Sequence, residues 1–510
     1  MYHAIIFTDV TDNIVISPSI GAFKCAHALR KHGYNCLVVG HLSEYSQQEL
    51  KELLSHAISD ATVLVGFSRS FFKNVEITVE PGQPTPPYPN IPHSDMFPQG
   101  KEFEKEIFAF VRGLNANIKF VAGGNIVSSK NISNKNVDYV CLGYSEASIV
   151  NLVDHLTKGT PLLGSSKNIH GRIMIDGALV PGYEFSEDDM IWLDTDVVNH
   201  KTLPIETGRG CIFKCKFCSY PMNGKSNLDY VKSSHNLYSE LLNNYEKFGV
   251  ENYIIIDDTF NDHPDKLQSV LTAVRRLPFQ PRFWAYTRLD LLCTRPDSID
   301  VLYDIGVRGF YFGIETLNLE TGRIIGKGYD RAKQIATLKR IKEKYGDSVS
   351  LHGSFMVGLP KESVEQSKET FEMIRTGQIP LDSWTAYGLK ITKVFENNWS
   401  SDIDKNYKSY GYVDRGTPDH SPNINWENEH MTNVIADQVA KEFVQSSRHT
   451  DVNFKLPAHT AFAIATFGLD LNQLISAHSE TFDWHQIEHV IKPKFVQDYK
   501  KILLELVKNK

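Results

Sequence analysis

The sequence predicts an α/β protein with two successive sets of alternating strands and helices and a mixed, mainly helical C-terminal region. Strand-like and helix-like hydrophobic patterns alternate over residues 1–165, and the alternation restarts at about residue 201 and continues to 395. The length of 510 residues is enough for two or three domains, each of which buries a core of its own.

The first set of elements predicts a doubly wound, Rossmann-like parallel sheet. Short apolar runs indicate five buried strands, at 4–7, 36–39, 61–66, 120–123 and 139–142. Helical periodicity occurs at 22–31, 47–57, 101–114 and 146–156. Strands separated by helices of this length form parallel sheets, and these folds bind ligands beyond the carboxyl ends of their strands.

A proline-rich segment, residues 71–100, follows the third predicted strand. It contains Pro81, Pro84, Pro86, Pro87, Pro89, Pro92 and Pro98. Proline removes backbone donors and restricts φ, so the segment is expected to be a long, semi-rigid loop. Its position at a strand end is consistent with a lid over a ligand, and a surface insertion without that role is the alternative.

The second set of elements predicts six βα units, which form a partial (β/α)6 barrel. The strand-like runs are at 202–206, 253–256, 282–285, 309–312, 350–357 and 384–391. The helical stretches are at 234–248, 265–276, 296–305, 331–345 and 364–376. In barrels of this kind the active site lies at the carboxyl ends of the strands.

These patterns place the domain boundaries. Residues 1–165 form the Rossmann-like domain, 166–200 a linker, 201–395 the barrel, and 396–510 a C-terminal region that ends in an amphipathic helix over 493–508. The C-terminal region is predicted either to face the substrate or to cap the barrel, with Asp419, His420, Trp426 and His430 as its candidate residues.

Composition restricts the environment and the partners. The net charge of −7 argues against a broad nucleic-acid footprint, although a local basic groove stays open. No apolar run approaches the length of a membrane span, and the N-terminal pattern is not that of a signal peptide. The seven cysteines are an odd number, and four of them are scattered through apolar stretches, which indicates the cytoplasm.

The most informative motif is RGCIFKCKFC, which begins just past the first strand of the second set. Cys211, Cys215 and Cys218 have the spacing C-x3-C-x2-C. Three thiolates from one short loop can ligate three irons of a 4Fe–4S cluster and leave the fourth iron open to another ligand. The alternative is structural zinc, which needs four closed ligands, and the sequence offers only the single Cys293 downstream.

This motif, at the end of a first barrel strand, resembles the signature of the radical SAM superfamily. The resemblance implies a 4Fe–4S cluster whose open iron binds S-adenosylmethionine, and an electron transfer that releases methionine and a 5′-deoxyadenosyl radical. It implies that Phe217 lies beside the adenine. Gly210 is expected to permit the tight backbone of the loop.

Further residues at predicted strand ends resemble the family in their order along the chain. Asp257 and Asp258 fall where the contact to the SAM amino group is expected, Glu315 where a ribose or methionine contact is expected, and Gly358 where the backbone approaches adenine. Arg288, whose guanidinium suits the SAM carboxylate or an anionic substrate, and Tyr286 are the predicted catalytic residues.

A Rossmann-like domain before such a barrel resembles the cobalamin-binding class of the superfamily. The matching segments are 16–40, the turn with Ser68 and Ser70, AGGN at 122–125, and 138–153. The loop after the first strand lacks the histidine of the D-x-H-x-x-G motif that usually ligates cobalt. Cobalamin is therefore one alternative, and the other is a structural or substrate-binding domain with Ser17, Ser19 and Gly21 near the strand end.

The resemblance implies methyl transfer if cobalamin binds, and cyclisation, epimerisation or rearrangement if it does not. It also implies an external electron donor of the flavodoxin or ferredoxin type. Small molecule, peptide, lipid and nucleic acid all stay open as substrates, and the acidic balance favours a small molecule or peptide. The non-enzymatic alternative is an iron–sulfur redox sensor or scaffold.

Overall fold

The computed structural model of the protein describes residues 1–9, 18–68, 96–124, 134–167, 171–220, 222–394, 400–419, 421–446 and 454–509. The chain divides into two compact units, and each is described by itself. Unit 1 comprises Met1–Glu184, Asp189–Pro204 and Trp484–Lys510. Unit 2 comprises Phe185–Asp188 and Ile205–Asp483.

Unit 1 is built on a seven-stranded sheet with the order β2-β1-β3-β4-β5-β7-β6. Its strands are β1 (Ala4–Thr8), β2 (Cys36–Val39), β3 (Leu64–Ser68), β4 (Lys119–Gly123), β5 (Tyr139–Leu142), β6 (Ser165–Lys167) and β7 (Ile173–Asp176). All the neighbouring strands pair in parallel except β6, which is antiparallel to β7. The order of the first five strands is that of flavodoxin-like doubly wound folds, so this part of the predicted fold is confirmed.

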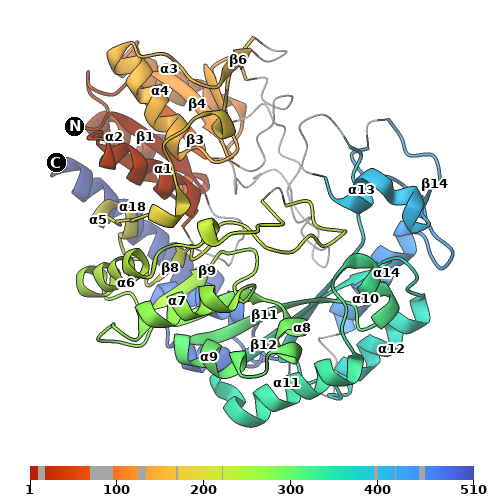
Figure 1. Ribbon diagram of the computed structural model, residues 1–510. Coiled ribbons are helices and arrows are strands. Elements are labelled where there is room, and N and C mark those ends of the chain that lie inside the picture. The colour runs from red at the N-terminus through yellow and green to blue at the C-terminus, as the bar shows by residue number, and fades with distance from the viewer. Residues whose placement is uncertain are drawn as a thin grey trace. The chain divides into compact units, whose positions relative to one another are not determined.

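The helices of unit 1 form two contacting groups. They are α1 (Ile20–Lys31), α2 (Gln47–Ala57), α3 (Lys101–Leu114), α4 (Glu146–Lys158), α5 (Asp194–Val197), α17 (Trp484–Gln486) and α18 (Lys492–Lys508). Helix α1 contacts α4, whereas α2 contacts both α3 and α18 (Figure 1). Alternate β1 residues such as Ile5 and Phe7 join α2, α3 and α18 in one core.

The segments that make up unit 1 differ from the predicted domain boundaries at two places. Strands β6 and β7 extend the sheet into the segment predicted as a linker, where β7 pairs with β5 from Tyr139↔Ile173 to Leu142↔Asp176. The C-terminal helix α18 belongs to unit 1, because Leu503 and Val507 are buried in its core. Strands β6 and β7 are too short for a hydrophobic period to mark them, and the periodicity of α18 predicts a helix but not the domain that the helix joins.

Unit 2 contains an open six-stranded sheet with the order β13-β12-β11-β10-β9-β8. The strands are β8 (Thr202–Ile205), at the boundary of the two units, β9 (Asn252–Ile255), β10 (Arg282–Thr287), β11 (Val307–Glu315), β12 (Ser350–Val357) and β13 (Ser383–Gly388). Strands β9 to β13 pair in parallel. The predicted partial barrel of six βα units is thereby confirmed as a parallel α/β sheet.

Long helices cover the outer face of this sheet (Figure 1), chiefly α6 (Ser234–Phe248), α7 (Pro264–Val274), α9 (Ser298–Ile305), α11 (Arg331–Tyr345) and α12 (Val364–Arg375). Side-chain caps start several of them, as where Ser363 and Gln366 form a reciprocal capping box at α12. Two short helices that the sequence analysis missed, α8 (Leu289–Thr294) and α10 (Leu319–Ile325), follow β10 and β11. Helices of one or two turns have too few periodic positions for a pattern.

The inner face of the sheet is marked by alternating burial along β11. Phe310, Phe312 and Ile314 are buried, while Tyr311 and Glu315 between and after them are partly exposed. Because successive strand residues point to opposite faces, Tyr311 and Glu315 project to the inner face, away from the covering helices. The inner face therefore presents aromatic and polar side chains.

The rest of unit 2 is mixed and helical, as predicted. It contains α13 (Asp402–Asn406), β14 (Val413–Asp414), β15 (Trp426–Glu427), α14 (Asn433–Ser446), α15 (Ala458–Ile464) and α16 (Leu471–Ser476). Helix α14 packs against β13, and α15 contacts β9 to β12. Among the helices described, none combines the length and the apolar character needed to cross a membrane.

Candidate functional site

The cysteine loop, residues 208–224, follows β8. It folds back on itself: the amide of Cys211 donates to the carbonyl oxygen of Met222 at 3.1 Å, and the amide of Lys225 donates to the carbonyl oxygen of Cys211 at 3.0 Å. Gly210 has a φ of 132°, and a Cβ there would lie 2.9 Å from the Met222 carbonyl oxygen. Only glycine adopts such a backbone without strain, which agrees with the role expected for it.

The three cysteines of the loop form no disulfide and are partly exposed. The thiol of Cys211 donates to Oγ1 of Thr259 at 3.5 Å, and Nη1 of Arg288 donates to Sγ of Cys215 at 3.2 Å. Burial raises the pKa of Cys211 and that of Cys218. A bound metal ion overrides this effect, because it deprotonates a coordinating thiol.

This donor set suits an iron–sulfur cluster. Three thiols on one short loop are the ligands that iron–sulfur clusters take, and Arg288 directs a hydrogen bond to one of the sulfurs. Cys211, Cys215 and Cys218 would hold the cluster.

Glu315 lies at a strained point beside the cysteine loop. Its φ is 65°, and the pairing of β11 with β12 shifts register between Gly313 and Glu315. Lys327 Nζ lies 2.9 Å from Oε1 of Glu315 and 5.8 Å from the centroid of the Phe217 ring. Strain of this kind in a non-glycine residue persists where the surroundings enforce it, often at functional sites. Lys327 therefore lies next to both Glu315 and Phe217, the two residues that the sequence predicted to contact S-adenosylmethionine.

Asp257 and Asp258, which follow β9, differ in their surroundings. Asp257 is 1% exposed; it accepts from the amide and the hydroxyl of Thr207 at 2.7 and 2.5 Å and pairs with Lys266 at 2.9 Å. Asp258 is exposed to solvent. Desolvation by the surrounding protein atoms raises its pKa to about 7, and a hydrogen bond from Tyr220 opposes this rise. Asp257 is therefore engaged by the protein, and Asp258 is the carboxyl group that a ligand can reach.

The predicted catalytic residues lie on or after β10. The Arg288 guanidinium makes a two-pronged pair with Asp290, at 3.0 and 2.6 Å. Tyr286 is 40% exposed, and its ring packs edge-on against Trp284 and Tyr311, with centroid distances of 4.7 and 4.9 Å. Tyr286 is thus open to a ligand, whereas Arg288 is occupied by protein groups.

Gly358, expected to approach adenine, follows β12 with a φ of 92°. A Cβ there would lie 2.6 Å from the Trp426 ring, and its carbonyl oxygen accepts from the Tyr412 hydroxyl at 2.8 Å. The structure therefore gives a packing reason for glycine at this position. The adenine contact stays a prediction.

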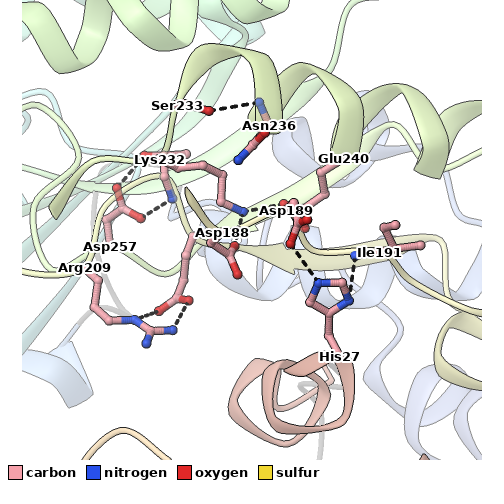
Figure 2. Close-up of polar contacts among 12 residues, drawn as sticks. His27, Asp188, Asp189, Ile191, Arg209, Lys232, Ser233, Asn236, Glu240 and Asp257 are labelled. Carbon is pink, nitrogen blue, oxygen red and sulfur yellow. Dashed lines mark hydrogen bonds and ion pairs between the residues drawn. The ribbon is translucent and has the colours of Figure 1, made fainter. Parts of the chain in front are cut away.

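Buried ion pairs support the start of the cysteine loop (Figure 2). Arg209 pairs with Glu206 at 2.6 Å. Nearby, Lys232 lies 2.7 Å from Asp188 and 2.6 Å from Glu240, and all three side chains are at most 2% exposed. The Lys232–Asp188 pair ties the short segment Phe185–Asp188 to the rest of unit 2, to which it belongs.

In unit 1, a small cavity lies beyond the carboxyl ends of β1 and β2. Its volume is about 10 Å³, roughly the space that one water molecule needs. The lining residues are Thr8, Asp9, Pro18, Ser19, Phe23, Gly40, His41, Asp196, His200 and Tyr499. Ser19, a candidate from the sequence, is therefore placed at a polar strand end.

Other sequence candidates have varied outcomes. Trp426 is fully buried, so it is a core residue. Asp419 is exposed, and His430 lies 3.4 Å from Glu429, so neither joins the cysteine loop through a contact that the structure records. The proline-rich lid, except for 96–100, and also Ser17, Ser70, Asn125 and His420, lie outside the described residues.

Several residues of the site were missed by the sequence analysis, namely Thr207, Thr259, Lys266 and Lys327. Lys327 stands between two glycines in IIGKG, a weak signal for a lysine held by tight turns. Lys266 lies within an ordinary helix pattern, and nothing in the sequence marks it as buried.

Comparison with known proteins identifies the domain that carries this loop. The family model described as Radical SAM superfamily matches residues 205–374. A protein described as "Uncharacterized methyltransferase PH0819" from Pyrococcus horikoshii is 25% identical over 301 residues, which is 54% of this chain and 61% of the relative. The match thus spans less than two thirds of that relative's length.

Solved structures share the fold over most of the chain. The radical S-adenosylmethionine methyltransferase TsrM from Kitasatospora setae, with cobalamin and a [4Fe–4S] cluster bound, has a TM-score of 0.63 at 12% identity and covers 100% of both chains. The cobalamin-dependent S-adenosylmethionine radical enzyme OxsB, with aqua-cobalamin and S-adenosylmethionine bound, has a TM-score of 0.56 at 13% identity, over 99% of this chain and 80% of OxsB. Residues 205–374 of this chain are a radical SAM domain.

Proposed function

We propose that this chain is a radical SAM methyltransferase that uses a 4Fe–4S cluster, S-adenosylmethionine and cobalamin. The observation that carries the proposal is the set of three thiols on the cysteine loop of a radical SAM domain. The methyltransferase relative and the cobalamin-dependent enzymes of the same fold support the choice of reaction.

Cys211, Cys215 and Cys218 would hold the cluster, which would supply the electron for reductive cleavage of a carbon–sulfur bond of S-adenosylmethionine. Asp258, open to solvent, accepts hydrogen bonds from the ammonium group of S-adenosylmethionine. Phe217 packs beside the adenine.

Residues of the inner face position the substrates. Glu315, held by Lys327, accepts hydrogen bonds from ribose hydroxyl groups, since a carboxylate is an acceptor only. Tyr286 supplies an aromatic surface on the inner face, where its exposed ring can contact the substrate and exclude water from it. In unit 1, the carboxyl ends of β1, β3 and β4 are the side on which doubly wound sheets bind cofactors.

The partners follow from this chemistry. The substrate is proposed to be a small molecule or peptide, and the electron to come from an external donor of the flavodoxin or ferredoxin type. The working compartment is proposed to be the cytoplasm, where the seven cysteines stay reduced.

The decisive experiment is anaerobic reconstitution of the cluster, followed by addition of S-adenosylmethionine and dithionite. 5′-Deoxyadenosine or S-adenosylhomocysteine is expected from the unsubstituted protein. Cys215→Ala should lose both iron and cleavage. Cys293→Ala, which removes a cysteine outside the loop, should retain both. A fully loaded cluster without cleavage would instead identify a redox sensor or scaffold.

A second measurement tests cobalamin. Protein purified in the presence of hydroxocobalamin is desalted, and its absorbance is compared with that of protein purified without it. Retained corrinoid at about one per chain supports methyl transfer. If S-adenosylmethionine is cleaved but no corrinoid is retained, the result would favour a cobalamin-independent rearrangement or cyclisation over methyl transfer.

A further inference from the structure

The guanidinium of Arg288 is held between a carboxylate and a cysteine thiol. Its Nε and Nη2 atoms donate to the two oxygens of Asp290 at 3.0 and 2.6 Å, and Nη1 donates to Sγ of Cys215 at 3.2 Å. Arg288 is 4% exposed. The group is therefore enclosed by protein and directed at one of the three thiols.

Other contacts fix this orientation. The guanidinium carbon lies 3.9 Å from the centroid of the Phe213 ring, within the cysteine loop. The backbone of Arg288 is clamped by Asn261, which accepts from its amide at 2.8 Å and donates to its carbonyl oxygen at 3.0 Å. The backbone, the ring stack and the carboxylate pair together leave Nη1 pointing at Cys215.

A guanidinium in this place has one property that a neutral donor lacks. It keeps its positive charge at every pH at which proteins fold. Hydrogen bonds to cluster sulfurs and nearby charge both set the reduction potential of an iron–sulfur cluster. One added electron makes the cluster more negative by one unit, so a fixed positive donor favours the reduced form.

We propose that Arg288 raises the reduction potential of the cluster through Cys215, and that Asp290 aims Arg288 at that sulfur. Arg288 is thus a positioning residue for electron entry, in place of the contact to the S-adenosylmethionine carboxylate or to an anionic substrate that the sequence suggested. The inference rests on the proposed function in one respect, that Cys215 ligates the cluster. The electron comes from a flavodoxin- or ferredoxin-type donor, or from dithionite in vitro, and no bond is formed or broken.

The test is a redox titration of the reconstituted cluster without S-adenosylmethionine, followed by electron paramagnetic resonance. Arg288→Gln is expected to lower the midpoint potential. At the midpoint of the unsubstituted protein, the ratio of oxidised to reduced cluster should therefore be about threefold to tenfold higher in the variant. The matched control is Arg282→Gln, which removes the same charge from the opposite end of β10, where Arg282 pairs with Glu251. The control midpoint should not move. An unchanged midpoint in Arg288→Gln with full iron loading would overturn the inference.

A second variant covers the case in which Arg288→Gln fails to load iron. Arg288→Lys keeps the charge but cannot make the two-pronged pair, so its midpoint should lie below that of the unsubstituted protein. If the midpoint potential of Arg288→Lys equals that of the unsubstituted protein, the orientation of the guanidinium does not set the potential. Failure of the proposed function is recognised separately, because the unsubstituted protein would then load no cluster or cleave no S-adenosylmethionine.

Discussion

Lys266 and Asp257 form an ion pair of 2.9 Å in which neither side chain is exposed to solvent. Lys266 also lies 3.3 Å from Asp262 and donates to the carbonyl oxygen of Thr259 at 3.0 Å. Since Thr259 contacts the Cys211 thiol, the buried lysine links the end of β9 to the cysteine loop.

Replacing this lysine is expected to be costly. Lys266→Met leaves two buried carboxylates without their cation and should lower the free energy of unfolding by about 3–5 kcal/mol. The measurement is urea unfolding of the protein before reconstitution. Lys344→Met is the control, because the side chains of Lys344 and its partner Asp300 are 48% and 42% exposed and pairs at the surface contribute less than about 1 kcal/mol. Equal midpoints for the two variants would contradict a structural role for Lys266.

Gly210→Ala is expected to disturb the cysteine loop. The φ of 132° and the close Met222 carbonyl oxygen make the substitution unfavourable by about 1–3 kcal/mol, so iron loading should fall. Iron content after reconstitution measures this. Gly113→Ala is the control, since Gly113 lies in α3 with open space around it, and alanine there should stabilise the helix by about 0.5–1 kcal/mol. Full iron loading in Gly210→Ala would show that the loop tolerates a side chain at its start.

Glu315→Gln is expected to weaken S-adenosylmethionine binding without loss of iron. The substitution removes a charged acceptor and leaves Lys327 without its ion-pair partner, so the dissociation constant should rise by about tenfold. Equilibrium dialysis of the reconstituted protein under anaerobic conditions measures it. Glu320→Gln, at an exposed position of α10, should bind as the unsubstituted protein does. If Glu315→Gln binds S-adenosylmethionine with unchanged affinity, Glu315 does not contribute to the binding site.

His200 is expected to make unit 1 sensitive to acid. Burial lowers its pKa to about 4, and its Nε2 atom lies 3.4 Å from Nε2 of His41. A folded-state pKa below the unfolded value of about 6.5 means that the contribution is complete above pH 6.5. It is then lost as the pH falls toward 4, and it amounts to about 3 kcal/mol at most.

This dependence is measured by urea unfolding between pH 7 and pH 4. His200→Gln should flatten the part of the curve that lies in this window. His56→Gln, at an exposed position of α2, should leave the curve unchanged. If the two variants have the same slope as the unsubstituted protein, His200 does not govern the acid sensitivity.

Local patterns were sufficient for much of the fold. The helix over 331–345 and the strand over 350–357 were predicted with the bounds that the structure has. Each is followed directly by a glycine, Gly346 after the helix and Gly358 after the strand, which marks its end. By contrast, the exposed strand β6 contains no apolar residue to mark it, and α8 is too short for a helical repeat.

The sequence by itself determined the cysteine motif, the alternation of strands and helices, and the order of candidate residues at strand ends, because these depend on neighbours in the chain. Only the tertiary structure decided that Arg288 points at Cys215, that Asp257 is occupied by Lys266, and that α18 packs in unit 1. Each of these contacts joins residues that are distant in sequence or whose burial depends on the whole fold. The partner of a buried charge depends on how the whole chain packs, and a short-range sequence pattern does not contain that information.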